Sequence, residues 1–414
     1  QYTMTLLEEH GILKMDFLGL RTLTVIQNAV KEVERIHGVK IDIDHIPDDD
    51  PKVYELIAQG KTEGVFQLES AGMKSFMKDL QPTRLEDLIA GISLYRPGPM
   101  EFIPKYVKGK KDGKNVTYTH PSLKPILEPT YGCIVYQEQV MQIVRDLAGY
   151  SLGRSDLVRR AMSKKKASVM AEERKNFVYG IEGEVPGCVK NGIPAETAEK
   201  IFDEMTDFAK YAFNKSHAAC YAVVGYQTAW LKTYYPVEFM SALMTSVIDF
   251  PSKVSEYIEE CRKMGIELLP PDINKGHAKF SVENGKIRFA LSAIKSIGEG
   301  LINSVVAERD KNGTFKSLTD FLTRMDEKDL NRRSIENFIK SGAFDCLGNK
   351  RSQYMAYYKN IYEGIVQKKK NNIAGQLDLF GLENMDDTAE DDSFAPMEEF
   401  PFSEILKMEK EVLG

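Results

Sequence analysis

One carboxylate stands where a metal-dependent reaction could use it. Residues 12–17 alternate in the manner of a β-strand that ends before Gly19, and Asp16 lies near its end. Carboxylate oxygens bind Mg²⁺, and two such ions can activate an attacking hydroxyl and stabilise a leaving phosphate. An Asp that bonds only to nearby backbone or to Arg21 is the commoner case. The residue by itself leaves both interpretations open.

A cationic segment offers contacts to phosphate. Residues 154–175 contain eight Lys and Arg residues and three acids, in a chain whose formal net charge is −6. Lys and Arg form short, strong hydrogen bonds with phosphates. A solvated surface face has the same composition, so the charge alone does not decide between them. The centre of the segment contains Arg159, Arg160, Lys164, Lys165 and Lys166.

A helix start forms a second possible anion site. Residues 218–231 predict a buried helix, with Asn214 or Ser216 as its N-cap. Amides at a helix N-terminus bind anions, and Lys215 and His217 would add to this attraction. An ordinary capped core helix with exposed Lys and His is the alternative. The aromatic residues that could stack on a base here are Tyr211 and Tyr221.

A short glycine-containing turn is predicted between two helical stretches at residues 294–300. Gly298 and Gly300 permit a tight turn next to Ile297, and its amides could cradle a phosphate. Such a contact would hold DNA by its backbone without reading the sequence. A single Gly-x-Gly turn is a weak signal.

A small apolar island interrupts the polar and acidic residues 371–401, which we expect to be mostly disordered. Exposed apolar anchors in such a setting often mark partner docking. The alternative is that the island packs back on its own chain. Its residues are Gln376, Leu377, Asp378, Leu379 and Phe380.

Composition excludes several other classes of protein. The 414 residues are 43% hydrophobic and 28% charged, and no apolar run is long enough for a membrane span. The five cysteines are widely spaced and the six histidines lack ligand spacing, so we expect reduced thiols in a cytosolic protein and no structural zinc. The sequence also contains no Walker loop or nucleophile triad, which disfavours a stand-alone nucleotide-binding enzyme.

The predicted elements are mainly helices with small β elements. A helix follows the first strand and is capped by Thr22 or Thr24. Residues 60–270 are mainly helical, and Asn284-Gly285 indicates a hairpin. Further expectations are a turn and helix start at Asp48–Pro51, a compact helical unit to about Leu347 and a helix over residues 351–370. Because Gln1 is not an initiator Met and residues 407–414 stop within a helical pattern, we expect a piece of a longer protein.

Taken in order, these segments resemble C-family bacterial replicative DNA polymerases, in the alpha-subunit type that carries no exonuclease insertion. KMDFLGLRTLT (14–24) is similar to their last palm segment. Similar to their fingers are GVFQLES (64–70), LYRPGPM (94–100), YQEQ (136–139), RRAMSKKK (159–166), FNKSHAACY (213–221) and YQTAWLK (226–232). Similar to their tandem helix-hairpin-helix region are IKSIGEG (294–300), LNRR (330–333) and SGAFD (341–345), and QLDLF (376–380) resembles their clamp-binding pentapeptide.

The resemblance implies a role for each candidate residue. Asp16 would be the third of three palm carboxylates that hold two Mg²⁺ ions. The nucleotide and template path would contain Arg96, Arg159, Arg160, Lys164, Lys165 and Lys166. The incoming triphosphate would contact Asn214, Lys215 and His217, with Tyr211 near the nascent pair. The hairpins at Ile297, Gly298 and Gly300 would grip the duplex backbone, and Gln376, Leu379 and Phe380 would anchor the clamp.

The implied domains are a palm segment (1–60), fingers (61–270), a tandem helix-hairpin-helix domain (271–350) and a linker with the clamp motif (351–414). The implied partners are primer–template DNA, deoxynucleoside triphosphates, the sliding clamp and other replisome subunits of the bacterial cytoplasm. Two palm carboxylates of the family are not in this sequence, because Asp42-Ile43-Asp44 comes in the wrong order. We therefore expect the chain to catalyse little by itself. A non-catalytic DNA- and clamp-binding adaptor is the alternative.

Overall fold

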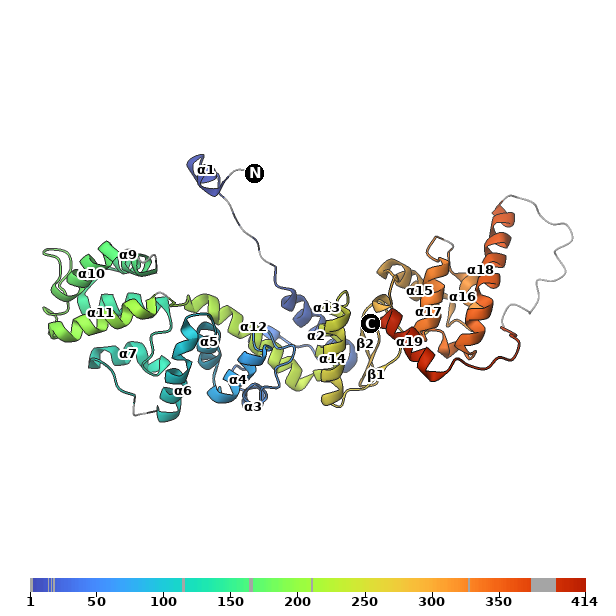
Figure 1. Cartoon of the computed structure of the whole chain (residues 1–414), viewed down its shortest axis with the longest axis horizontal. Coiled ribbons are helices and arrows are strands. Elements are labelled where there is room, and N and C mark those ends of the chain that lie inside the picture. The colour runs from blue at the N-terminus through green and yellow to red at the C-terminus, as the bar shows by residue number, and fades with distance from the viewer. Residues whose placement is uncertain are drawn as a thin grey trace. The chain divides into compact units, whose positions relative to one another are not determined.

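The computed structural model describes residues 3–13, 15, 17, 19–113, 116–163, 167–209, 211–326, 328–373 and 392–414. It consists mainly of helices with one small sheet, as predicted (Figure 1). The chain forms two compact units, residues 42–234 and residues 1–41 with 235–414. The boundaries of these two units differ from those of the predicted functional domains. The domain boundaries therefore stay predictions.

The unit of residues 42–234 has two hydrophobic cores. One core lies among α3, α4, α5 and α12, and the other among α8 to α11. The turn at Asp48–Pro51 is confirmed, because Asp50 caps α3 by accepting from the Lys52 amide at 2.9 Å. The helices are α3 (Pro51–Ala58), α4 (Ala71–Leu80), α5 (Leu85–Leu94), α6 (Ile103–Asp112), α7 (Lys124–Leu127), α8 (Gln137–Ala148), α9 (Leu152–Ser163), α10 (Ala167–Tyr179), α11 (Ala195–Ala209) and α12 (Lys215–Tyr234).

Helix α12 is the buried helix predicted over residues 218–231, and it packs against α5 and α3 (Figure 1). Small residues on its packed face, Ala218, Ala222 and Ala229, let the helices approach closely. Thr228 Oγ1 accepts from the Phe66 amide at 3.1 Å. The loop that precedes α4 is thereby fixed to α12.

The unit of residues 1–41 and 235–414 contains the sheet, in the order β1-β3-β2. The predicted hairpin is confirmed, because Asn284 (φ 52°) and Gly285 (φ 75°) turn the chain between antiparallel β2 and β3. Helix α2 packs on α13. The elements are α1 (Met4–Glu9), α2 (Arg21–His37), α13 (Pro236–Ser246), α14 (Pro251–Lys263), β1 (Leu268–Leu269), β2 (Ser281–Glu283), β3 (Lys286–Arg288), α15 (Glu299–Asn312), α16 (Leu318–Arg324), α17 (Arg332–Ser341), α18 (Arg351–Ile373) and α19 (Phe402–Leu413).

Two predictions near the N-terminus are wrong. The described residues among 12–17 form no strand, and Leu13 and Phe17 are 80% and 88% exposed. A strand needs a neighbouring backbone to satisfy its N–H and C=O groups, and the described residues provide none here. Helix α2 begins at Arg21 with Leu20 as N-cap, so Thr22 and Thr24 lie inside its first turn.

The predicted disorder of residues 371–401 is wrong for their last ten residues, 392–401, which we call the C-terminal strap. Asp392 is 9% exposed, and its carboxylate accepts from the Leu318 and Thr319 amides at 2.6 and 3.1 Å. These amides belong to the first turn of α16, where a carboxylate satisfies unpaired donors. An acidic residue that indicated disorder is thus a helix-capping group.

A second carboxylate of the strap caps α18 in the same way. Glu399 accepts from the Arg351 and Ser352 amides at 2.9 and 3.0 Å. Between the two caps, the Phe394 ring stacks on Tyr357, with centroids 4.8 Å apart and planes at 4°. The strap is therefore an integral part of the helical unit.

Asp392→Ala should destabilise this unit by about 1–2 kcal/mol, because two helix-start amides lose their acceptor. Thermal unfolding of the chain measures the loss. Glu398→Ala removes an exposed acid of the same strap and should leave the melting temperature unchanged. Equal effects of the two substitutions would contradict the capping role.

Candidate nucleotide and nucleic-acid site

The segment that leads into α12 is fixed by the start of α8. The Gln137 amide donates to the Phe213 carbonyl at 3.0 Å, and the Phe213 amide donates to the Val135 carbonyl at 3.1 Å. Gln137 Nε2 adds a third hydrogen bond, to the Ala212 carbonyl at 3.1 Å. This pairing sets where the first turn of α12 begins.

The first turn of α12 carries two of the predicted cationic residues. Asn214 Oδ1 accepts from the His217 amide at 2.8 Å, which makes Asn214 the cap in preference to Ser216. The Lys215 amide donates to both carboxylate oxygens of Glu138 at 3.1 Å. Because helix-start amides attract negative charge, Glu138 occupies the position where an anionic ligand would compete.

A pocket of about 610 Å³ opens beside this turn. The His217 ring lies between those of Phe213 and Tyr221, at centroid distances of 5.4 and 4.3 Å. The Arg96 guanidinium lies 4.2 Å from the Phe213 ring centroid, in the geometry of a cation–π contact. The pocket thus combines a cluster of aromatic rings with the positive charge of Arg96. Polar side chains in its lining are Gln67, Glu69 and Ser70.

Arg159 joins the same network from α9. Its Nη1 donates to Gln137 Oε1 at 3.1 Å, and its Nε and Nη2 donate to Asp156 at 2.9 and 2.7 Å. Arg160 also pairs with Asp156, at 2.7 Å, but its side chain is 63% exposed against 21% for Arg159. The hydrogen bond from Arg159, supported by both positive charges, holds the pKa of Asp156 below its ordinary value.

The structure brings Arg96, Arg159, Asn214, Lys215 and His217 to the elements around one junction. Tyr211 precedes this turn and is 41% exposed. Several predicted residues lie outside the described part of the chain and stay predictions. They are Asp16, Lys164, Lys165, Lys166, Gln376, Leu377, Asp378, Leu379 and Phe380.

The predicted duplex-binding turn belongs to the other unit. Gly298 is the N-cap residue of α15 and Gly300 lies in its first turn, both exposed. Ile297 is buried in the core of that unit, so only its backbone could meet a phosphate. The Asn337 side chain donates to the Lys295 carbonyl at 2.6 Å and ties the turn to α17.

Comparisons with known proteins match two parts of the chain to known domains. Residues 22–184 match the bacterial DNA polymerase III alpha subunit finger domain, and residues 265–354 match the helix-hairpin-helix motif. The chain is similar over its whole length to DNA polymerase III subunit alpha of Borreliella burgdorferi (43% identity over 415 residues), Thermus aquaticus (44% over 421) and Escherichia coli K12 (44% over 426). The chain belongs to the family of DNA polymerase III alpha subunits. It spans 36%, 33% and 36% of the length of these three relatives.

Two residues that were not among the predicted site residues hold the junction together. Gln137 and Glu138 lie within the YQEQ motif, which indicated the family but not what either side chain does. Gln137 joins Arg159 to the segment before α12, and Glu138 meets the Lys215 amide. These partners are distant in sequence, so spacing provides no signal for them.

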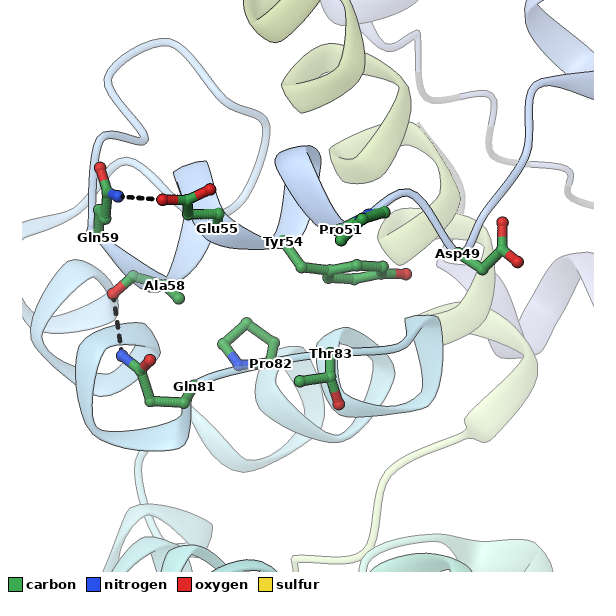
Figure 2. A pocket seen from close by; sticks show the side chains of 9 residues that line it. All are labelled: Asp49, Pro51, Tyr54, Glu55, Ala58, Gln59, Gln81, Pro82 and Thr83. Atoms are coloured by element: carbon green, nitrogen blue, oxygen red, sulfur yellow. Dashed lines mark hydrogen bonds between the residues drawn. The ribbon is translucent and has the colours of Figure 1, made fainter.

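A second pocket of the same unit, of about 460 Å³, contains none of the predicted residues. Figure 2 shows it between α3 and the connection from α4 to α5. Tyr54 and Pro82 line it, and the Gln81 side chain donates to the Ala58 carbonyl at 3.2 Å across one end. Its lining offers Asp49 and Glu55 but no cation, so it does not suit a phosphate.

The remaining predictions concern the cysteines, membrane spans and metal ligands. All five cysteines are free thiols, as predicted. No described helix is long and apolar enough to cross a membrane. Among the described residues, no cluster of three potential metal ligands is present, and Asp16 is not one of these residues. Magnesium binding therefore stays a prediction for the intact protein.

Arg159→Ala should lower the melting temperature of the 42–234 unit by roughly 2–4 °C, as expected for the net loss of about one hydrogen bond. Arg160→Ala is the matched control, because its more exposed side chain should contribute almost nothing. Differential scanning calorimetry of both variants checks this. If Arg160→Ala costs as much as Arg159→Ala, the link to Gln137 does not stabilise the junction.

Proposed function

We propose that this chain is the nucleotide-gripping, duplex-holding and clamp-docking part of a replicative DNA-directed DNA polymerase. In the intact protein, a primer 3′-hydroxyl attacks the α-phosphate of an incoming deoxynucleoside triphosphate and pyrophosphate leaves. The observation that carries the proposal is the junction at the start of α12, where Arg159 contacts Gln137, the Lys215 amide contacts Glu138 and His217 lines a pocket with aromatic rings.

The junction suits a triphosphate because positively charged side chains lie near helix-start amides that a phosphate could bind. A phosphate at the first turn of α12 would replace the Glu138 carboxylate and gain the positive charge of Lys215 and the amides of this turn. The rings of His217 and Tyr221 offer flat apolar surfaces to a sugar or base. Since the protein contributes position and charge, base choice would rest on template pairing.

The remaining roles concern the other unit and the intact protein. The turn at residues 297–300 would hold the duplex through its backbone, and residues 376–380 would bind the sliding clamp. Two Mg²⁺ ions, with Asp16 among their ligands, would supply the charge that phosphoryl transfer needs. The protein would work in the replisome of the bacterial cytoplasm together with other subunits.

The adaptor alternative explains the helix-hairpin-helix unit and the pentapeptide. It gives no purpose to the pocket beside α12, whose Arg96 guanidinium and aromatic rings a duplex-binding adaptor does not require. The finger-domain match over residues 22–184 also lies outside the part of the chain that an adaptor would use.

His217→Ala and Lys215→Ala, each made in the full-length polymerase, should raise the KM for nucleotides by about 10-fold or more, as expected for one lost charge-assisted contact. Duplex affinity should change less than about twofold, because these residues face the nucleotide. Steady-state extension and DNA-binding titrations give the two quantities. Lys200→Ala on α11 is the control for loss of one exposed charge. Wild-type KM values in both variants would remove α12 from the nucleotide site.

Phe380→Ala should abolish binding to a purified bacterial sliding clamp, since an aromatic anchor carries much of the energy of such a motif. We expect thermal stability to change by less than about 0.5 kcal/mol, because the segment's polar composition predicts an exposed motif. The control is Phe402→Ala, which removes a 75% exposed ring outside the pentapeptide. Surface plasmon resonance on immobilised clamp distinguishes the two. A large loss of thermal stability would show that Phe380 packs on its own chain.

A further inference from the structure

Two segments of the 42–234 unit lie along each other next to the α12 junction. Residues 96–102 follow α5, and residues 208–213 lead into α12. Three contacts join them in antiparallel order. The pairs are Arg96 with Phe213 (4.2 Å, guanidinium to ring centroid), Gly98 with Tyr211, and Phe102 with Phe208 (4.0 Å between centroids).

The middle pair depends on the absence of a side chain. A Cβ at Gly98 would lie 2.4–3.0 Å from three atoms of the Tyr211 ring, so the ring would have to move. Gly98 also has φ +103°, a conformation that residues with side chains rarely adopt. Pro97 and Pro99 restrict the backbone on both sides, so the loop cannot easily give way.

Tyr211 is partly exposed. Its ring rests on Gly98, while the residue is 41% exposed and lies three positions before the Asn214 cap. The backbone that follows it is fixed by the pairing of Phe213 with Val135 and Gln137. An exposed ring on such a rigid support presents a flat face at a defined position.

We propose that Gly98 is a positioning residue that acts through Tyr211 to set how strictly the polymerase selects the incoming nucleotide. This inference rests on the proposed nucleotide site at α12. A correctly paired base would pack against the fixed ring, whereas a mispair of different shape would not. A displaced ring would lose this discrimination while the phosphate contacts of Lys215 and His217 stay in place.

The test uses the full-length polymerase with Gly98→Ala. We expect the ratio of kcat/KM for correct over incorrect nucleotides to fall roughly tenfold, with the KM for the correct nucleotide nearly unchanged. Amide exchange in residues 208–213 should become faster. Gly192→Ala is the matched control, because Gly192 has φ +87° but open space around its Cβ position. A similar loss of selectivity in the control would overturn the proposal.

Tyr211→Ala decides whether Gly98 acts through the ring. In that background, Gly98→Ala should add almost no further loss of selectivity, because the clash is gone. The backbone strain of a side chain at φ +103° is the same in both backgrounds, so the comparison isolates the clash with the ring. Tyr211→Ala alone should lower selectivity even if Gly98→Ala does not fold. Independent, additive effects, or wild-type selectivity in Tyr211→Ala, would overturn the inference.

The same variants separate this inference from the proposed function. Loss of selectivity in Tyr211→Ala, with none in Gly98→Ala, would refute the positioning role alone. Faster amide exchange in Gly98→Ala, with wild-type nucleotide selectivity in both variants, would refute the positioning role alone. Wild-type KM values in Lys215→Ala and His217→Ala would refute the placement of nucleotide binding at this junction and the inference with it.

Discussion

The backbone pairing between Phe213 and the start of α8 is the contact on which the site depends. It joins segments about 75 residues apart, so the chain must close a long loop before the pairing can form. The two cores of the unit offset that cost, because they meet at this point. Tyr136 belongs to one core and Val140 to the other. The position of α12 is thus a product of the whole unit.

The electrostatics of the junction explain how an acidic chain can offer a cationic surface. Arg159 and Arg160 share the Asp156 carboxylate, and the first amide of α12 already faces Glu138. Asp156 therefore holds the two guanidinium groups, and Glu138 occupies the backbone amide at the start of α12. An arriving phosphate gains only the difference between its own interactions and those it replaces.

Local signals in the sequence predicted local structure well. The apolar run before Leu231, the Asn214 cap and the Asn284-Gly285 turn all depend on near neighbours, and the structure confirms each. Residues 12–17 have the alternating polar and apolar side chains of a strand, but this pattern does not show whether a neighbouring strand is available for pairing. The acidity of residues 392–401 resembled that of a disordered segment because the sequence does not show which amides its carboxylates meet.

Some residues of the candidate site could be predicted from the sequence and others could not. The residue types at 214–217 indicated an anion-binding helix start, the cationic segment included Arg159, and the family resemblance added Arg96. Neither source could identify Gln137, because its importance comes from contacts with two distant segments. The roles of Asp16 and of the pentapeptide remain predictions, since both lie outside the described residues.

The strap also makes the stability of its helical unit depend on pH. Burial acts to raise the pKa of Glu399, but hydrogen bonds from the Phe400, Arg351 and Ser352 amides outweigh it, and the pKa is lowered overall. A carboxylate with a lowered pKa stabilises the fold only while it is ionised. Its contribution is complete above the pKa of the unfolded chain and disappears as the pH falls through the folded value. Acid therefore weakens this unit where the strap caps the start of α18.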